Sequence, residues 1–330
     1  MKEVLNKLFQ YQSLSREEAF QILSNLATGQ YNNSQMAAFL TVYLMRTITV
    51  DELEGFRDAM LELCVKVPVD DYNAIDLCGT GGDGKNTFNI STLSSFVVAG
   101  AGQHVVKHGN YGVSSVSGSS NVLESMGAKF TNDTDQIKRS LDESGICFLH
   151  APLFHPAMKN VGPVRKELGI KTFFNMLGPM VNPAFPKSQL VGVFSLELAR
   201  LYGYLYQNTS KNFVIVHALD GYDEVSLTSG FKIIANDQEA VFEPEDIGLP
   251  RLTQEQLHGG ETIEESAKIF QGVLKGQGTE AQEAAVIANS GLAIATGKQV
   301  SIQEGIEQAR TSLKSGKALD AFKKFISVNS

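Results

Sequence analysis

The sequence predicts an α/β protein with a small N-terminal all-helical domain and a larger α/β domain whose mostly parallel central sheet is flanked by helices. Residues 1–66 carry helical patterns alone, whereas strand and helix patterns alternate from residue 74 onwards. Such alternation is typical of a parallel sheet covered on both faces. A chain of 330 residues is long enough for two domains of this kind.

The helical domain is marked by two helix-start signals. Ser15 and Thr49 each stand three positions before a glutamate, which is the pattern of a capping box. Between them, residues 34–46 are apolar on most faces and predict a buried helix. A second helical stretch is expected to pack on the first, so the predicted domains are 1–66 with 160–183 for the helical part, and 67–159 with 184–330 for the α/β part.

The α/β domain is predicted from short apolar runs that end in glycine or polar residues. In such sheets, ligands bind at the carboxyl ends of the strands, where two glycine-rich loops follow adjacent strand candidates. The predicted strands are 74–79, 104–110, 145–151, 189–194 and 212–219, the helices are 91–102, 120–127, 133–144 and 196–207, and the loops are 79–84 and 109–118.

Composition limits the classes of function. The net charge of −8 argues against general nucleic-acid binding, which needs clustered cations. Cys64, Cys78 and Cys147 each lie in an apolar run and are expected to be buried free thiols, as in a reducing cytoplasm. No apolar run approaches the ~20 residues of a membrane span, and the N-terminus lacks the apolar core of a signal peptide.

Residues 76–92, DLCGTGGDGKNTFNIST, match two phosphate-binding patterns and satisfy neither. The dinucleotide pattern needs an acidic residue about 20 positions later, where Lys107 stands. The P-loop needs Ser or Thr after its lysine, but asparagine follows Lys85, and the next helix is expected to begin only at Ser91. The segment keeps the features that the two patterns share, which are glycines that turn backbone N–H groups towards an anion and a helix N-terminus beyond them. These features predict an anion-binding loop.

Two such loops side by side predict a ligand with two phosphate groups. Asn89, Ser91 and Thr92 add side-chain donors to the first loop, and Lys107 with the small residues of 109–120 forms the second. The residues leave open the alternative that both are plain β–α turns.

Two further features suggest a metal and an acid. Asp223 and Glu224 are adjacent after the fifth predicted strand, and paired carboxylates beside phosphates are typical of magnesium, although a solvated turn explains them equally well. The guanidinium of Arg165 can bind a planar carboxylate with two hydrogen bonds. Taken alone, Arg165 also fits a surface helix.

The motifs GTGGD, NIST, KHGN, SSVSGS, FNMLGPMVNP and DEVSLT, in this order, resemble those of the anthranilate phosphoribosyltransferases of tryptophan biosynthesis over nearly the whole chain. The resemblance implies transfer of the 5-phosphoribosyl group from phosphoribosyl pyrophosphate to the amine of anthranilate, with release of pyrophosphate. It implies Mg²⁺ as cofactor, these two small molecules as partners in place of nucleic acid or membrane, a homodimer formed through the helical domain, and a cytoplasmic enzyme.

The resemblance also implies which residues bind. Because the amine of anthranilate is neutral at pH 7, no general base is assigned, and positioning with leaving-group stabilisation is expected to drive the reaction. The implied contacts are Gly79, Gly82, Asp83, Thr87, Asn89, Ile90, Ser91, Thr92, Lys107 and Ser119 for phosphoribosyl pyrophosphate, Gly79, Asn110 and Arg165 for anthranilate, and Ser91, Asp223 and Glu224 for magnesium.

The second loop departs from the family pattern of KHGN-Arg followed by Ser-Lys-Ser-Gly-Ser-Ala-Asp. Tyr111 replaces the arginine, Val116 the lysine, and Ser120–Asn121 the Ala-Asp pair, so the loop loses two positive charges and one negative charge. Two other functions therefore stay open. A pyrimidine-nucleoside phosphorylase shares KHGN and GTGGD, and a non-catalytic relative that binds nucleic acid is disfavoured by the net charge.

Overall fold

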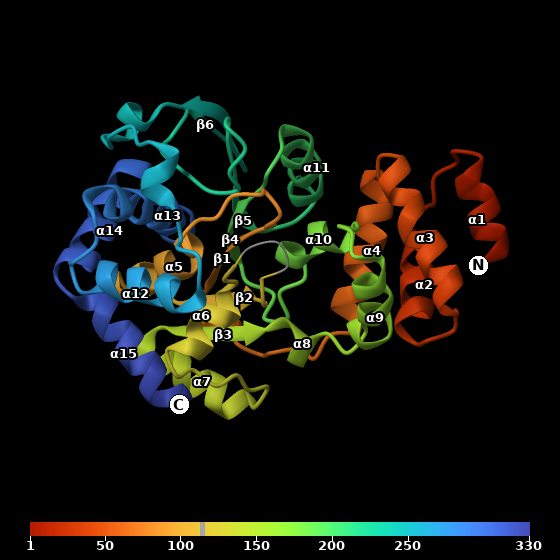
Figure 1. Ribbon diagram of the computed structural model, residues 1–330, viewed down its shortest axis with the longest axis horizontal. Coiled ribbons are helices and arrows are strands. Elements are labelled where there is room, and N and C mark those ends of the chain that lie inside the picture. The colour runs from red at the N-terminus through yellow and green to blue at the C-terminus, as the bar shows by residue number, and fades with distance from the viewer. Residues whose placement is uncertain (113–115) are drawn as a thin grey trace. The chain divides into compact units, whose positions relative to one another are not determined.

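The computed structural model describes residues 1–112 and 116–330, which form one helical and one α/β unit (Figure 1). The helical unit holds residues 1–67 and 151–183, and the α/β unit holds 68–150 and 184–330. Residues 151–159 thus differ from the sequence-based expectation, which placed them in the α/β domain. The backbone gives the reason, because the N–H of Val65 donates to the carbonyl of Phe154 at 2.8 Å and ties this stretch to the end of the first helical block.

The helical unit is built from two sequence segments that share an aromatic core. Phe39, Tyr43 and Phe56 contact Phe173 of the second segment, and the rings of Phe56 and Phe173 stack with centroids 4.5 Å apart. The second segment therefore completes the core begun by the first. The helices are α1 (Lys2–Phe9), α2 (Arg16–Ala27), α3 (Asn33–Met45), α4 (Val50–Glu62), α8 (Ala151–Phe154), α9 (Met158–Leu168) and α10 (Phe174–Leu177), followed by the 3₁₀ turn η2 (Gly178–Met180).

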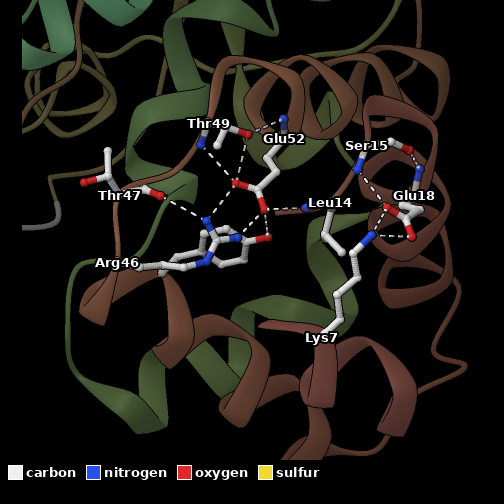
Figure 2. Close-up of polar contacts among 9 residues, drawn as sticks. Lys7, Leu14, Ser15, Glu18, Arg46, Thr47, Thr49 and Glu52 are labelled. Atoms are coloured by element: carbon white, nitrogen blue, oxygen red, sulfur yellow. Dashed lines mark hydrogen bonds and ion pairs between the residues drawn. The ribbon is translucent and has the colours of Figure 1, made fainter. Parts of the chain in front are cut away.

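Both predicted capping boxes are present, at the starts of α2 and α4. Glu52 does more than cap α4, as Figure 2 shows. Its fully buried carboxylate accepts from the N–H of Leu14 at 3.0 Å, from the hydroxyl of Tyr43 at 3.2 Å and from the N–H of Thr49 at 2.9 Å, and it forms an ion pair with Arg46. One side chain therefore joins the α1–α2 connection, the end of α3 and the start of α4.

The α/β unit contains a seven-stranded sheet in the order β3-β2-β1-β4-β5-β6-β7. The first five strands are parallel, as predicted, whereas β6 is antiparallel to β5 and β7 to β6. The last two strands were not predicted. The strands are β1 (Ile75–Gly79), β2 (Val105–Gly109), β3 (Ile146–His150), β4 (Ser188–Gly192), β5 (Asn212–Ala218), β6 (Phe231–Ala235) and β7 (Glu239–Phe242).

Helices cover the sheet on both faces. Leu77, Leu190 and Val216 belong to the main core, which α5 and α13 complete. On the other face lies α11, whose Tyr206 ring packs against Phe213 with centroids 5.4 Å apart. The helices are α5 (Ile90–Gly100), α6 (Ser119–Ser125), α7 (Thr134–Ser144), α11 (Leu196–Gln207), α12 (Ile263–Leu274), α13 (Glu280–Lys298), α14 (Ile302–Lys314) and α15 (Lys317–Asn329), with 3₁₀ turns η1 (Asp70–Tyr72), η3 (Pro244–Ile247) and η4 (Gln254–Leu257).

The strand order reverses between β1 and β4. The chain runs from β1 through β2 to β3 on one side and then returns with β4 and β5 on the other. In open parallel sheets, the crevice beyond the carboxyl ends at this reversal is where ligands bind. Gly79 and Gly192 end the two strands and lie opposite each other in register.

All three cysteines are free thiols; Cys64 and Cys147 are buried, and Cys78 is only half-buried. Within residues 1–112 and 116–330, every helix is too short or too polar to cross a membrane.

Candidate functional site

Asp223 lies directly against the two strand ends at the reversal point. A methyl group added to Gly79 would overlap the Asp223 carboxylate, and one added to Gly192 would overlap its backbone carbonyl. Glycine is therefore required at both positions so that the segment carrying Asp223 can approach the sheet. Gly79 was expected to take part in the site, whereas Gly192 was not.

The first loop forms the turn that its glycines predict. Gly81, Gly82 and Gly84 adopt positive φ angles of 66°, 78° and 74°, a region that side chains with a Cβ disfavour. The N–H of Gly81 points inward and donates to Oδ2 of Asp223 at 2.7 Å. One backbone donor of the predicted anion-binding loop is thus already directed at the carboxylate side of the site.

Helix α5 begins differently from expectation. It starts at Ile90, one residue before the predicted Ser91, and no side chain of the described residues caps it. The residue before it, Asn89, has a φ of 44° and donates from Nδ2 to the carbonyl of Ser117 at 2.8 Å. The Asn89 amide thus joins the two glycine-rich loops. Ile90 and Thr92 are buried behind this turn.

A segment that was not assigned to the site supports the first loop from outside. Thr87 pairs with His258 in an isolated β-bridge, and the N–H of Gly259 donates to the carbonyl of Asn86 at 2.7 Å. The side chain of Asn86 donates in return to the carbonyl of Gly260 at 2.8 Å. Residues 86–87 are therefore held as part of a two-stranded contact.

Lys107 lies at the centre of the site and is almost fully buried. Its Nζ donates to the carbonyl of Leu77 at 2.5 Å and lies 3.4 Å from Oγ of Ser91. Burial lowers the pKa of Lys107, while the charges of nearby acidic groups, Asp223 and Glu224 among them, act in the opposite direction. Lys107 joins β2 to the start of α5, where the predicted phosphate loop ends.

The pKa values of both carboxyl groups in the site are raised above their ordinary range. Burial raises the pKa of Asp223 to about 7, and the charge of Asp83 adds to this shift. Burial, followed by the charge of Asp223, raises the pKa of Glu224 well above its ordinary value. Glu224 is 8% exposed, and among the described residues its Oε1 has no hydrogen-bond partner.

These features fit a divalent cation. Ser91, Asp223 and Glu224 line one cavity of about 20 Å³, which has room for a species the size of one water molecule. Asp223 and Glu224 are adjacent in the chain, the carboxylate of Glu224 is buried, and its Oε1 has no hydrogen-bond partner among the described residues. A bound cation would offset the negative charge and give this oxygen a ligand. Magnesium is usually bound by one or two carboxylates together with substrate phosphates. Within the described parts of the chain, no cluster of three or more His, Cys, Asp or Glu side chains is arranged to hold a metal ion.

The second loop is held by neutral groups where the family pattern has charges. Oδ1 of Asn121 accepts from the N–H groups of Gly112 and Gly118, each at 3.0 Å, and so joins the two ends of the loop. The carbonyl of Asn110 accepts from the hydroxyl of Ser119 at 3.2 Å. The first two residues of the SSVSGS motif, 114 and 115, lie outside the described residues together with residue 113.

Tyr111 does not extend freely from the second loop. Its hydroxyl donates to Glu124 at 2.8 Å, and its ring meets His150 edge-on with centroids 4.8 Å apart. His150 is fixed in turn by Ser120, whose hydroxyl lies 2.8 Å from Nδ1. Tyr111 and Ser120, which replace family residues, thus pack against the same histidine. Val116 is 42% exposed and supplies no charge.

Arg165 lies on α9 of the helical unit. Its guanidinium donates to Oδ1 of Asn175 at 3.2 Å and lies over the Phe174 ring, 5.2 Å from the centroid. Burial lowers its pKa, and its Nε has no partner among the described residues. A half-buried cation held by one amide and one ring retains donors for an anion.

The α/β unit brings most of the predicted residues to one edge of its sheet. The first loop, Lys107 and the carboxylate pair surround the ends of β1, β2 and β4, and Asn89 joins them to the second loop. Sequence reasoning missed Gly192, residues 258–260 and Asn289, a buried α13 residue that also lines the cavity. None carries a local signal, because each matters only through a distant segment that folds against it.

Comparisons with known proteins agree with this architecture. Residues 2–64 match the helical bundle domain of a glycosyl transferase family, and residues 71–319 match the α/β domain of the same family. Proteins named anthranilate phosphoribosyltransferase are close relatives. That of Christiangramia forsetii is 62% identical over 324 residues, with 98% of both chains covered. That of Bacteroides fragilis is 53% identical over 330 residues, with 100% of both covered.

Solved structures of the same name superpose on nearly the whole chain. The Thermus thermophilus protein has a TM-score of 0.92 at 32% identity, with 98% of each chain covered. The Saccharomyces cerevisiae protein, in complex with PRPP and Mg, has a TM-score of 0.88 at 26% identity, covering 98% of this chain and 96% of that one.

Proposed function

The chain belongs to the anthranilate phosphoribosyltransferase family, and from this we propose that it transfers the 5-phosphoribosyl group of phosphoribosyl pyrophosphate to the amine of anthranilate. Pyrophosphate is released, and the product enters tryptophan biosynthesis. The C1–O bond to pyrophosphate breaks, the amine nitrogen forms the new bond to C1, and one proton leaves that nitrogen.

The observation that carries this proposal is the joining of two glycine-rich loops to a buried carboxylate pair at the reversal point of the sheet. The loops supply backbone donors for two phosphate groups. The carboxylates of Asp223 and Glu224, with Ser91, supply oxygen ligands for magnesium. A solved relative from Saccharomyces cerevisiae is in complex with PRPP and Mg, which supports the same ligands here.

Positive groups and backbone donors are proposed to stabilise the negative charge of the phosphoribosyl donor. Negative charge grows on pyrophosphate as the C1–O bond breaks, and magnesium, when bound, neutralises part of it. Backbone N–H groups of the first loop and of the start of α5 are proposed to bind the phosphates, and Lys107, 3.4 Å from Oγ of Ser91, is proposed to add a positive charge there. Gly79, Gly82, Asp83, Thr87, Asn89, Ile90, Ser91, Thr92, Lys107 and Ser119 are the assigned contacts of phosphoribosyl pyrophosphate.

Anthranilate is assigned to Arg165, Asn110 and Gly79. The carboxylate of anthranilate matches the guanidinium of Arg165, whose Nε has no partner among the described residues. The amine of anthranilate is a neutral nucleophile at pH 7, so its orientation at C1 matters more than a strong base. This is why no residue is assigned as the base.

The homodimer is proposed to form through the helical domain. Six large hydrophobic side chains among the described residues of the helical unit are exposed, and the most exposed are Met45 by 83%, Tyr11 by 79%, Phe9 by 59% and Leu44 by 49%. Apolar groups gathered on a surface favour a protein partner. We propose a cytoplasmic location, which the three free thiols support because disulfides are rare in that compartment.

The test is the consumption of anthranilate, followed by its fluorescence. Consumption should require both phosphoribosyl pyrophosphate and magnesium, and a parallel reaction with a pyrimidine nucleoside and inorganic phosphate should give no product. The reverse pattern would refute the proposal.

A double variant tests the metal assignment. Asp223→Asn with Glu224→Gln should abolish turnover at low magnesium. The control is Asp142→Asn with Glu143→Gln, a second adjacent acidic pair that is exposed, and it should not abolish turnover. Equal rates for both double variants would refute the metal assignment.

A further inference from the structure

The buried side chain of Asn289 contacts the backbone beside the carboxylate pair. It lies on α13 and is 5% exposed. Its Oδ1 accepts from the N–H of Val225 at 3.0 Å, and its Nδ2 donates to the carbonyl of Val225 at 2.9 Å and to that of Ala285 at 2.8 Å. One amide thus bonds both backbone groups of the residue that follows Glu224.

The carboxylate pair is thereby fixed from both directions along the chain. On its N-terminal side, Asp223 is bonded by the N–H of Gly81 and lies against Gly192. On its C-terminal side, Val225 is fully buried and held by Asn289. Asn289 also lines the cavity that Asp223 and Glu224 face.

The chemistry of the contact selects an amide. An asparagine offers a donor and an acceptor on one planar group, which matches the N–H and C=O of a single residue. A leucine of similar size would leave both backbone groups of Val225 buried and unbonded, which is costly. Asn289 therefore holds the backbone of Val225, next to the two carboxylate residues, through two specific hydrogen bonds.

We propose that Asn289 is a positioning residue that sets the direction of Glu224 and Asp223 towards magnesium by holding Val225. The proposal rests on the proposed function for the identity of the metal and its phosphate partner. Groups that orient metal ligands from behind usually change metal affinity by 10–100-fold when they are lost. We expect a loss of that size here, without a comparable loss of anthranilate binding.

The test compares Asn289→Leu and Asn289→Ala with Thr296→Val. Thr296 is buried on the same helix, but within the described part of the chain its hydroxyl bonds only to the carbonyl of Leu292, at 2.8 Å. Its loss therefore removes a buried polar group without touching the carboxylate segment. The probe is magnesium with inorganic pyrophosphate, titrated into each protein by calorimetry. Thermal melts fix a temperature at which all of the variants are folded.

The Asn289 variants should bind magnesium pyrophosphate at least tenfold more weakly than the wild type and Thr296→Val. In turnover assays their magnesium requirement should rise while the KM for anthranilate stays within about twofold. Wild-type affinity in a folded Asn289 variant would overturn the proposal, as would an equal rise in the KM of both substrates. Failure of the proposed function is distinguishable, because the wild type would then bind the probe without consuming anthranilate.

Discussion

Replacement of Gly259 by alanine probes how closely the first loop must be held. The added Cβ would lie 2.5 Å from the carbonyl oxygen of Thr87, 2.6 Å from its carbonyl carbon and 3.0 Å from the N of Phe88. All three are backbone atoms, so no side chain can rotate away. Ordinary van der Waals contact begins near 3.4 Å, so residues 87–88 must retreat by about 1 Å.

A shift of this size is large on the scale that matters for catalysis. Displacement of a reacting group by about 1 Å costs on the order of 100-fold in rate. Thr87 also hydrogen-bonds Glu224, so the shift reaches the carboxylate side of the site. Overpacking itself costs about 1–3 kcal/mol, which corresponds to a melting temperature about 2–12 °C lower for a domain of this size.

The assay is kcat/KM for phosphoribosyl pyrophosphate from anthranilate fluorescence, with thermal melting of the same samples. The matched control is Gly203→Ala, inside α11, where the new Cβ would lie 3.5 Å from Ile234 in ordinary contact. That change should leave activity intact and stabilise the helix slightly. If Gly259→Ala retained wild-type kcat/KM and melting temperature, the loop would not depend on residues 258–260 and the reasoning would fail.

Other perturbations address the remaining features. Glu52→Gln leaves Arg46 without its carboxylate and should lower the free energy of unfolding by about 3–5 kcal/mol in urea titrations followed by circular dichroism; a loss below 1 kcal/mol would contradict a central role. Arg165→Ala should raise the KM for anthranilate about tenfold or more, and a defect confined to the phosphoribosyl donor would contradict its assignment. Because the pKa of Asp223 is raised to about 7, protons compete with magnesium below that pH. Magnesium titrations of the initial rate should therefore show tighter binding at pH 8 than at pH 6, and a pH-independent affinity would disprove this competition.

The five parallel strands were predictable because each is a short apolar run closed by glycine or polar residues. Strand β6 is also a short, mostly buried apolar run, and the prediction overlooked it, whereas β7 was missed for a physical reason. Half of β7 is exposed, and Val241 is 55% exposed, so no apolar face marks it as a strand. Its place at the edge of the sheet is set by pairing with β6, which a local pattern does not encode.

The parts of the candidate site that could be predicted are those whose residue types lie together in one short segment of the sequence. Glycines before a helix, a buried lysine at a strand end and adjacent carboxylates each carry a physical meaning in sequence alone. The need for glycine at position 192 arises from Asp223, which comes 31 positions later in the numbering and packs over it. Asn89 was predicted as a side-chain donor for an anion, yet its amide nitrogen donates to the carbonyl of Ser117 and so joins the two loops.

The antiparallel pairing of β5 and β6 supports the segment that carries Asp223 and Glu224. Residues 219–230 form a hairpin connection, closed by the N–H of Leu219 on the carbonyl of Gly230 at 2.9 Å and by Asp220, which accepts from the hydroxyls of Thr228 and Ser229 at 2.6 and 2.7 Å. Since its ends are already neighbours, ordering this segment costs less conformational entropy than ordering a long crossover. An insertion in this tethered hairpin would therefore displace both carboxylates at once.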